Sequence, residues 1–350
     1  MSEDGVKSLL KDKEESLYNK EKSLFKKEIG SFIELGFKKN LEYYNGNDIA
    51  RLNSGRAAIY HSLKVLGCNK VYLPYYQCET VRKFLVRKGI EIRYYFINSN
   101  FEPILEEVPT DYAVIIVNYY GIMSRERMRL LREKYNNVII DNAQGFFFQP
   151  MDGCMNVYSP RKFIGVPDGS YVIGKNAIND TKDYDEDFSS GTSLFLLQRI
   201  EYGLEGIAYE SRKQNEDRID NSDIKLMSKL TRTILDGTDY KDIITKRKEN
   251  FAIARRLFDK VNLLTLSNLV DIECVPMVYP LIIDKEGLIE KLIDEKIFQG
   301  RWWSYLLNEM KKDTFEYYVS KNLVPITIDQ RYNYDDIQFM FLKCKEFLKD

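Results

Sequence analysis

The sequence predicts an α/β protein in which a mainly parallel central sheet is flanked by helices, with a smaller α/β domain toward the C-terminus. Two observations lead to this fold class. Short β-branched runs, at residues 114–117 (VIIV) and 138–140 (VII), are typical of strands buried on both faces. Between residues 71 and 141 such runs alternate with helical segments. This alternation favours parallel strands joined by crossover helices, with ligands at the carboxyl ends of the strands.

Length and composition are those of a soluble globular protein. A chain of 350 residues can bury a large core and suggests two or more structural units. A net charge of −1 gives no broad attraction to nucleic acid or to an anionic membrane. No apolar run approaches the roughly 20 residues of a membrane span, and the N-terminus has no apolar signal-peptide core. We therefore expect a cytoplasmic protein without nucleic-acid or membrane partners.

The cysteines and the histidine exclude several kinds of site. The five cysteines are scattered without a CxxC pair, as expected of reduced thiols in the cytoplasm. The single histidine, His61, rules out a multi-histidine metal site and makes a Ser-His-Asp triad unfavourable. No GxGxxG follows a strand and no Walker loop occurs, so neither a dinucleotide site nor an ATP site is indicated.

We divide the chain into an N-terminal helical arm (1–45), a large domain (46–237) and a small C-terminal domain (238–350). The arm is rich in Lys and Glu with interleaved leucines, which is typical of amphipathic helices that are solvated or contact a dimer partner. The first helix of the large domain begins after Ser54, a plausible N-cap, and ends at Gly67.

The remaining elements follow from periodicity and from turn residues. In the large domain we expect strands at 71–74, 90–97, 114–118 and 138–140, and a further strand on each side of the turn at 160–165. We expect helices at 79–88 and 124–135, and long polar helices over 190–235. In the small domain we expect a linker helix at 239–258, strands at 275–283 and 323–326, and helices at 286–296 and from about 335.

Two residues near the middle of the chain indicate cofactor chemistry. Asp141 ends the buried strand at 138–140, and Lys162 lies in a turn between Pro160 and Gly165. A lysine in such a turn is a candidate amine nucleophile, and an acid at the end of a parallel strand points into the ligand crevice. Together they suggest pyridoxal phosphate (PLP), whose aldehyde the lysine would hold and whose ring nitrogen the acid would keep protonated. By spacing alone, a capping aspartate and a solvated lysine remain the alternative.

Five stretches in order strengthen the cofactor interpretation: SGR (54–56), LPYY (73–76), DNAQ (141–144), YSPRKFIGVPDG (158–169) and MSKL (227–230). This series resembles the DegT/DnrJ/StrS family of PLP-dependent sugar aminotransferases over roughly residues 50–340. The resemblance implies the fold type I of PLP-dependent transferases, with Lys162 and Asp141 as catalytic residues. It also implies that the cofactor is bound by Gly55, Arg56, Tyr76, Cys78, Asp141, Gln144, Ser159 and Lys162.

The sequence departs from the family's pattern at several cofactor contacts. Arg56 stands where the family has a phosphate-binding Thr, and Val157 stands where it has a phosphate-binding Ser, so Ser159 and Arg56 are expected to compensate. Cys78 stands in place of the aromatic residue that stacks on the ring, so that Tyr76 is the alternative. Ile224 and Leu226 replace the Asn and Arg of a segment that approaches the partner subunit in the family.

The resemblance implies a nucleotide-linked keto-sugar as amino acceptor and glutamate or a similar amino acid as donor, in surface polysaccharide synthesis. It also implies a homodimer with the active site at the interface. Candidate substrate residues are Tyr120 at a strand end, and Arg301 and Trp302 in the small domain, although a tryptophan can equally belong to the core. The alternatives are a non-catalytic or scaffolding relative, or another PLP-dependent reaction on an amino acid.

Overall fold

The computed structural model describes residues 30–349. The helices predicted within the first 29 residues lie outside this range, and residues 30–45 form neither helix nor strand. The chain divides into a unit Met1–Phe37 and a compact unit Lys38–Asp350, which contains all the elements below. The boundary predicted at 237/238 falls inside this second unit, so the division into a large and a small domain stays a prediction.

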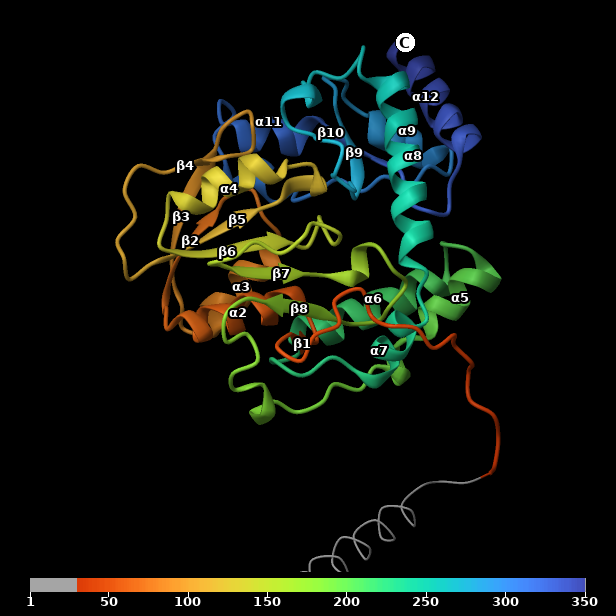
Figure 1. The fold of residues 1–350 in the computed structure, drawn as a ribbon. Helices are drawn as coiled ribbons and strands as arrows, with labels where there is room; N and C mark the ends of the chain where they lie inside the picture. Colours follow the sequence, from red (N-terminus) through yellow and green to blue (C-terminus); the bar gives the residue numbers. More distant parts are fainter. Residues whose placement is uncertain (1–29, 350) are drawn as a thin grey trace, which may run out of the picture. The chain divides into compact units, whose positions relative to one another are not determined.

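The central sheet has eight strands in the order β1-β8-β7-β6-β5-β2-β3-β4, and Figure 1 shows them stacked from β4 to β1. Strands β3, β2, β5, β6 and β7 are parallel, whereas β1, β8 and β4 pair antiparallel at the edges. The predicted mainly parallel sheet is therefore confirmed. The strands are β1 (Ala50–Leu52), β2 (Lys70–Pro74), β3 (Glu91–Ile97), β4 (Pro103–Ile104), β5 (Ala113–Val117), β6 (Asn137–Asn142), β7 (Met155–Tyr158) and β8 (Ser170–Ile173).

The helix at the start of the sheet region forms as its capping residues predict. In α2 (Gly55–Leu66), Ser54 accepts a hydrogen bond from the Ala57 N–H, and Gly67 ends the helix at φ 69°. This helix packs its buried face, including Ile59, against β6, β7 and β8. The other helices of this region are α3 (Glu79–Arg87), α4 (Arg125–Glu133), α5 (Leu194–Tyr202), α6 (Ile207–Asn221) and α7 (Lys229–Asp236).

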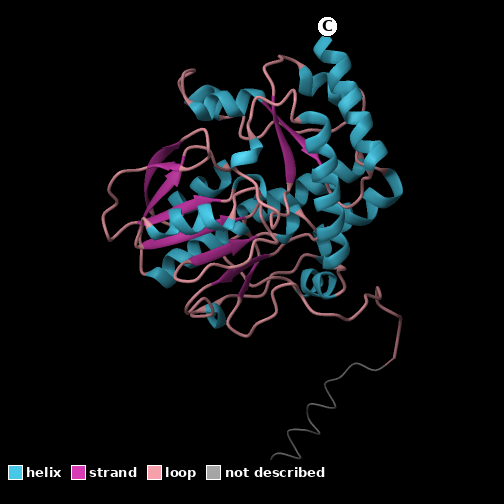
Figure 2. Ribbon diagram, turned by 45° about the horizontal axis from the view of Figure 1, so that its top comes forward, coloured by secondary structure: helices cyan, strands magenta, loops and turns pink. Residues whose placement is uncertain are grey.

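Residues 240–349, which we call the C-terminal lobe, surround a two-stranded antiparallel sheet of β9 (Val278–Ile282) and β10 (Leu323–Thr327). In Figure 2 these two strands lie between helices. The long α8 (Tyr240–Phe258) packs against β9 and α12 (Tyr334–Lys349). The lobe also contains α9 (Leu288–Asp294), α10 (Leu306–Glu309) and α11 (Phe315–Asn322). No helix in the described part of the chain is long and apolar enough to cross a lipid bilayer.

Two details differ from the sequence prediction. Edge strands β1 and β4 were not predicted, because each is too short for a β-periodicity to appear. The long helices expected over 190–235 are three shorter ones. Gly203 and Gly206, both at positive φ, separate α5 from α6, because their backbone conformations lie outside the helical region.

Two glycines let the loops after β5 and β6 touch. A Cβ on Gly121, whose φ is 71°, would lie 2.4 Å from the backbone oxygen of Gln144. A Cβ on Gly145 would lie 2.6 Å from the side-chain nitrogen of Asn118. This close approach places the Asp141–Gln144 loop directly beside Tyr120.

We predict that Gly121→Ala destabilises the protein far more than Gly67→Ala. Both glycines have positive φ, but a Cβ on Gly67 meets nothing within 4 Å. Gly67→Ala should therefore lower the free energy of unfolding by about 1 kcal/mol, the strain of alanine in a left-handed conformation. Gly121→Ala adds a backbone clash and should cost about 2 kcal/mol more. Urea unfolding of both variants measures the difference; equal losses would show that the two loops are not in contact.

Candidate active site

The predicted site residues at the strand ends come together because β5, β6 and β7 are parallel neighbours. In the sheet register Asp141 stands opposite Val117 on one side and Val157 on the other. The chain then leaves β7 through Ser159 and enters a short turn, Pro160–Lys162. Asp141 and Lys162 therefore belong to the carboxyl ends of adjacent strands, as predicted.

The Asp141 carboxylate is buried and held by hydrogen bonds at both oxygens. Its side chain is 6% exposed. Oδ2 accepts a hydrogen bond of 2.9 Å from Gln77 Nε2, and Oδ1 accepts one of 2.9 Å from the Ala143 N–H. Burial raises the pKa of the Asp141 carboxyl, and the Ala143 N–H and the Lys162 charge oppose this rise. No cation between residues 30 and 349 forms an ion pair with it.

Lys162 has an exposed side chain, and its amine makes no hydrogen bond or ion pair with the described residues. Its turn is fixed by backbone bonds, because the N–H groups of Phe163 and Ile164 both donate to the Pro160 oxygen at 2.8 Å. The backbone is therefore ordered while the amine stays available. This is the arrangement that a nucleophilic lysine requires.

The C-terminal lobe holds the residue after Lys162 through a buried arginine. The Arg247 guanidinium lies 4.5 Å from the centre of the Phe163 ring, and its nitrogens donate to the oxygens of Pro276, Met277 and the Gln330 side chain. Gln330 Nε2 in turn donates to the Phe163 oxygen at 2.8 Å. Burial lowers the pKa of Arg247 to about 10.

Tyr76, Tyr120 and Gln144 form a buried polar and aromatic cluster beside Asp141. The Tyr76 and Tyr120 hydroxyls are 2.9 Å apart, and the Tyr120 N–H donates to Gln144 Oε1 at 2.7 Å. Trp302 reaches this cluster from the C-terminal lobe, with its ring centre 5.6 Å from that of Tyr120. Trp303 packs edge-on against Tyr76 at 4.3 Å. Tyr76, Tyr120 and Gln144 are all buried, so the cluster is closed to water.

Cys78 is partly buried and packs against the hydrophobic core. It precedes α3, and its Sγ is 3.2 Å from the Thr80 hydroxyl oxygen. The strand end before it is tied to the C-terminal lobe, because the Tyr305 hydroxyl contacts the backbone oxygens of Tyr75 and Gln77 at 3.2 and 2.7 Å. That contact fixes Gln77, the partner of Asp141.

Gly55 and Arg56 begin α2, as predicted, but the Arg56 guanidinium already has a partner. Its Nη1 forms an ion pair with Asp220 at the end of α6. The first turn of α2 has no acidic residue of its own, and a Cβ on Gly55 would meet nothing within 4 Å. The helix N-terminus therefore offers open space and N–H groups to an anion, with Arg56 and Asp220 beside it.

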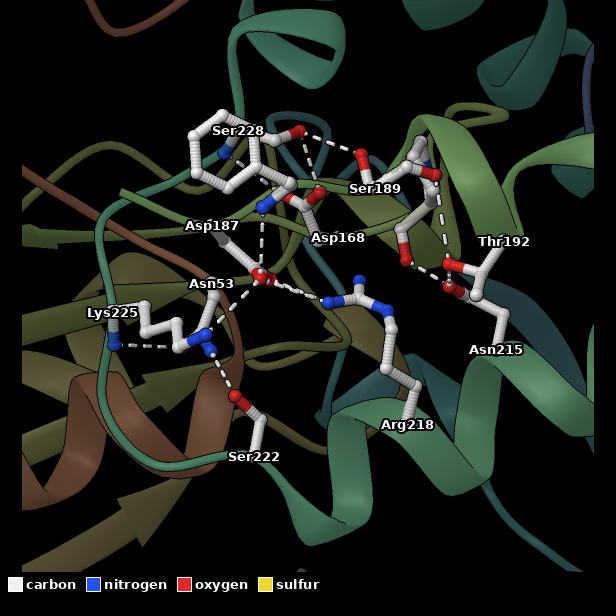
Figure 3. A network of polar contacts seen from close by, with 12 residues as sticks. Asn53, Asp168, Asp187, Ser189, Thr192, Asn215, Arg218, Ser222, Lys225 and Ser228 are labelled. Carbon is white, nitrogen blue, oxygen red and sulfur yellow. Dashed lines mark hydrogen bonds and ion pairs between the residues drawn. The ribbon is translucent and has the colours of Figure 1, made fainter. Parts of the chain in front are cut away.

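Two of the sequence stretches behind the resemblance meet in one buried network (Figure 3). Asp168 is fully buried and accepts hydrogen bonds from the Ser228 N–H at 3.1 Å and the Ser228 hydroxyl at 2.6 Å. Ser228 also caps α7 and contacts Ser189 at 2.7 Å. The YSPRKFIGVPDG and MSKL stretches thus support each other structurally.

A cavity of about 1000 Å³ adjoins the Lys162 turn. The turn contributes Arg161, α5 and α6 contribute Arg199 and Arg212, and the C-terminal lobe contributes Phe298 and Tyr332. Arg161 forms an ion pair with Glu216. Arg199 and Arg212 form none with residues 30–349, so the cavity presents two free guanidinium groups.

Arg301 is not part of this arrangement. Its nitrogens contact the Lys321 backbone oxygen at 2.6 Å and Glu290 at 3.3 Å, both within the C-terminal lobe. Sequence reasoning also missed four residues, Gln77, Asp220, Arg247 and Gln330. Only Gln77 had a usable signal, since it follows Tyr76 at the end of a predicted strand. The other three act through contacts between distant parts of the chain.

The comparisons with known proteins identify the fold. No family model matches the sequence, and no match was found among curated proteins. Solved structures do match. The putative sugar aminotransferase Spr1654 from Streptococcus pneumoniae, in its PMP form, has a TM-score of 0.60 at 14% identity over 85% of this chain and 87% of that chain. Sugar aminotransferase CalS13 from Micromonospora echinospora has a TM-score of 0.58 at 14% identity, with the same two coverages.

A third similar structure is NtdA from Bacillus subtilis with bound cofactor PMP, with a TM-score of 0.57 at 14% identity over 88% of this chain and 74% of that chain. At such identities the likeness shows the fold. This chain therefore has the α/β fold of the sugar aminotransferases, with the mainly parallel sheet that the sequence predicts.

We predict that Asp141→Asn stabilises the cofactor-free protein at neutral pH. Because burial raises the pKa of Asp141 above its unfolded value of about 4, the folded state binds the proton more tightly. The stability that this tighter proton binding gives the folded state is fully present below pH ~4 and is lost as the pH rises through the folded pKa. Asn cannot ionise, and its amide could donate to Gln77 Oε1, which is buried without a partner. The stability difference should therefore grow from pH 4 to pH 7.

Thermal unfolding of wild type and variant across this pH range measures the effect. Asp111→Asn is the control, because Lys70 lowers the pKa of Asp111 and any effect must have the opposite sign. A pH-independent loss of stability in Asp141→Asn would instead identify Asp141 as a structural capping residue.

Proposed function

We propose that this chain is a PLP-dependent aminotransferase that moves an amino group from an amino acid such as glutamate to a nucleotide-linked keto-sugar. The observation that carries this proposal is the placement of two residues in the fold of the sugar aminotransferases. Asp141 is a buried carboxylate on β6, and Lys162, on the turn after β7, has an amine without an ion-pair partner among the described residues. We further propose that it acts in the cytoplasm, in the synthesis of a surface polysaccharide.

The Asp141 side of the site fits the ring of PLP. A buried carboxylate without a cationic partner is costly, and a protonated ring nitrogen would supply the missing charge. Gln77 Oε1 is also buried there without a hydrogen-bond donor. Tyr76, next to Gln77 in the chain, is the aromatic candidate for ring contact because Cys78 has no ring.

The α2 side fits the phosphate less directly. Gly55 leaves open space at the helix N-terminus, where N–H groups attract an anion. Ser159 follows β7 nearby in the chain and can supply a hydroxyl in place of the one missing at Val157. Arg56 can supply charge-assisted hydrogen bonds only by exchanging its present partner, Asp220.

The bound cofactor would supply an electron sink for amino transfer. Lys162 is the residue that would hold its aldehyde, and the Lys162 amine is placed to carry a proton at Nζ. Asp141 would keep a proton on the ring nitrogen. The cluster of Tyr76, Tyr120 and Trp302 would exclude water from one side of the crevice.

The cavity beside the Lys162 turn is our candidate for the acceptor. Its volume of about 1000 Å³ suits a large ligand. The free guanidinium groups of Arg199 and Arg212 suit a diphosphate, and the rings of Phe298 and Tyr332 suit a base or a sugar. We assign the diphosphate here rather than to Arg301, because Arg301 already has partners.

A homodimer with the active site at its interface is supported by an exposed apolar surface on α5 and α6. Ile200 is 82% exposed, and Tyr202 is also exposed, yet both line the cavity. A second copy packed on this surface would cover apolar side chains and close the cavity at once. The other large apolar side chains of this surface are Leu194, Leu197, Ile207 and Tyr209.

A second candidate is a non-catalytic relative that keeps the fold. The observation in its favour is that the Arg56 and Arg161 guanidinium groups are both paired with carboxylates, while Val157 lacks a hydroxyl. The free amine of Lys162 and the buried, oriented carboxylate of Asp141 favour the enzyme. Another PLP-dependent reaction on an amino acid would use the same two residues and differ in its acceptor.

We predict that borohydride reduction of the protein with PLP attaches the pyridoxyl group to Lys162 alone. Lys162→Ala should abolish both this label and the visible absorption band of bound PLP, because no other lysine lies on the turn after β7. Lys229→Ala, which changes an exposed lysine at the start of α7, should leave both unchanged. Peptide mass spectrometry locates the label. Labelling of a different lysine, or no PLP binding by wild type, would refute the enzyme proposal.

We predict that Ile200→Asp converts a dimer into a monomer, because a buried unpaired carboxylate would cost several kcal/mol at an apolar interface. Val86→Asp is the control, since Val86 is 63% exposed on α3. Sedimentation velocity distinguishes the two species. If Ile200→Asp stays dimeric, or if wild type is monomeric, the α5–α6 surface is not a dimer interface.

A further inference from the structure

Helix α6 places two carboxylates on one face, one turn apart, and each pairs with an arginine of the candidate site. Asp220 pairs with Arg56 in the first turn of α2, and Glu216 pairs with Arg161, which directly precedes Lys162. The first turn of α2 contains no acid, so this carboxylate comes from a residue 164 positions away in the chain. Negative charge has thus been placed beside a helix N-terminus that is otherwise suited to an anion.

Buried contacts fix α6 in this position (Figure 3). Asn215 is fully buried, donates to the Pro167 oxygen at 2.7 Å and accepts a hydrogen bond of 2.7 Å from the Thr192 hydroxyl. Arg218 donates to both oxygens of Asp187 at 2.9 and 2.8 Å, and Asp187 is itself buried. These contacts lie on the same helix as Asp220. The Asp220 carboxylate therefore stays near Arg56 without any movement of the helix.

The two partners of the ion pair differ in exposure. The Arg56 side chain is 9% exposed, whereas that of Asp220 is 40% exposed. Arg56 must keep a polar partner because it is nearly buried, but Asp220 can turn toward water at little cost. A doubly charged phosphate at the α2 N-terminus could therefore replace Asp220 as the partner of Arg56.

We propose that Asp220 competes with the cofactor phosphate for Arg56 and thereby limits how tightly this chain retains its cofactor. This inference rests on the proposed function, since the competing anion is the phosphate of PLP. Removal of the Asp220 charge should strengthen phosphate binding. A partly exposed ion pair corresponds to at most roughly a fivefold change in affinity.

The test compares PLP with pyridoxal, which has the same ring and aldehyde but no phosphate. Dissociation constants of both compounds are measured by absorbance titration of the cofactor-free wild type and of Asp220→Asn. We expect Asp220→Asn to bind PLP roughly two- to fivefold more tightly and pyridoxal with unchanged affinity. Asp220→Ser is a second variant without the charge and should behave alike. Thermal unfolding of the cofactor-free variants shows whether each is folded.

Two controls connect the effect to Arg56. Glu216→Gln removes the same charge from the same helix, one turn away, and should change PLP affinity less than twofold because its partner is Arg161. Arg56→Ala should weaken PLP binding by about a factor of ten or more, since a charge-assisted pair to phosphate is lost. In the Arg56→Ala background, Asp220→Asn should have an effect of less than twofold.

The inference is overturned if PLP affinity is unchanged or weaker in both Asp220 variants, if pyridoxal affinity changes equally, or if Glu216→Gln has the same effect as Asp220→Asn. Each of these results leaves the proposed function intact, because PLP still binds. Failure of wild type to bind either compound would overturn the proposed function and this inference together.

Discussion

The candidate site depends on the burial of one carboxylate. Asp141 is fixed on β6 by pairing with both neighbouring strands, and its oxygens are held by Gln77 and the Ala143 N–H. Burial raises its pKa, and Lys162 is the positive charge among the described residues that opposes this rise. A position that served stability alone would be better filled by a neutral side chain. The structure thus retains a group that is unfavourable without a cationic ligand.

The rest of the site keeps this carboxylate and the backbone at Lys162 in place. The C-terminal lobe contributes Tyr305, which contacts the backbone at Gln77, and Arg247, which packs on the ring after Lys162. Both catalytic candidates are therefore positioned by the same lobe, through residues more than eighty positions away. The phosphate side is less complete, because Arg56 has Asp220 as its partner in this state.

Much of the fold follows from local sequence signals, and the site follows only in part. The β-branched run at 138–140 and the caps Ser54 and Gly67 act through neighbouring residues, so strands and helix ends could be predicted. The edge strand β1 could not be predicted, because it exists through pairing with β8, more than a hundred residues later.

The same distinction between local signals and long-range contacts explains which site residues could be predicted. Asp141 and Lys162 could be predicted, because strand ends converge in any parallel sheet. The partner of Arg56 could not, since it is set by packing between α2 and α6, which are distant in sequence. The long polar helices expected over 190–235 were wrong for a local reason, because Gly203 and Gly206 separate α5 from α6.

The central claim is that Asp141 and Lys162 form one site for amino transfer through PLP. The most direct measurement mixes the PLP-loaded protein with glutamate in the absence of any acceptor and quantifies 2-oxoglutarate. The account predicts one 2-oxoglutarate per bound cofactor in wild type, with loss of the original visible band. It predicts almost none within the same time in Asp141→Asn loaded with PLP. If wild type forms no keto acid from glutamate or any other amino acid, or if Asp141→Asn reacts at the wild-type rate, the claim is wrong.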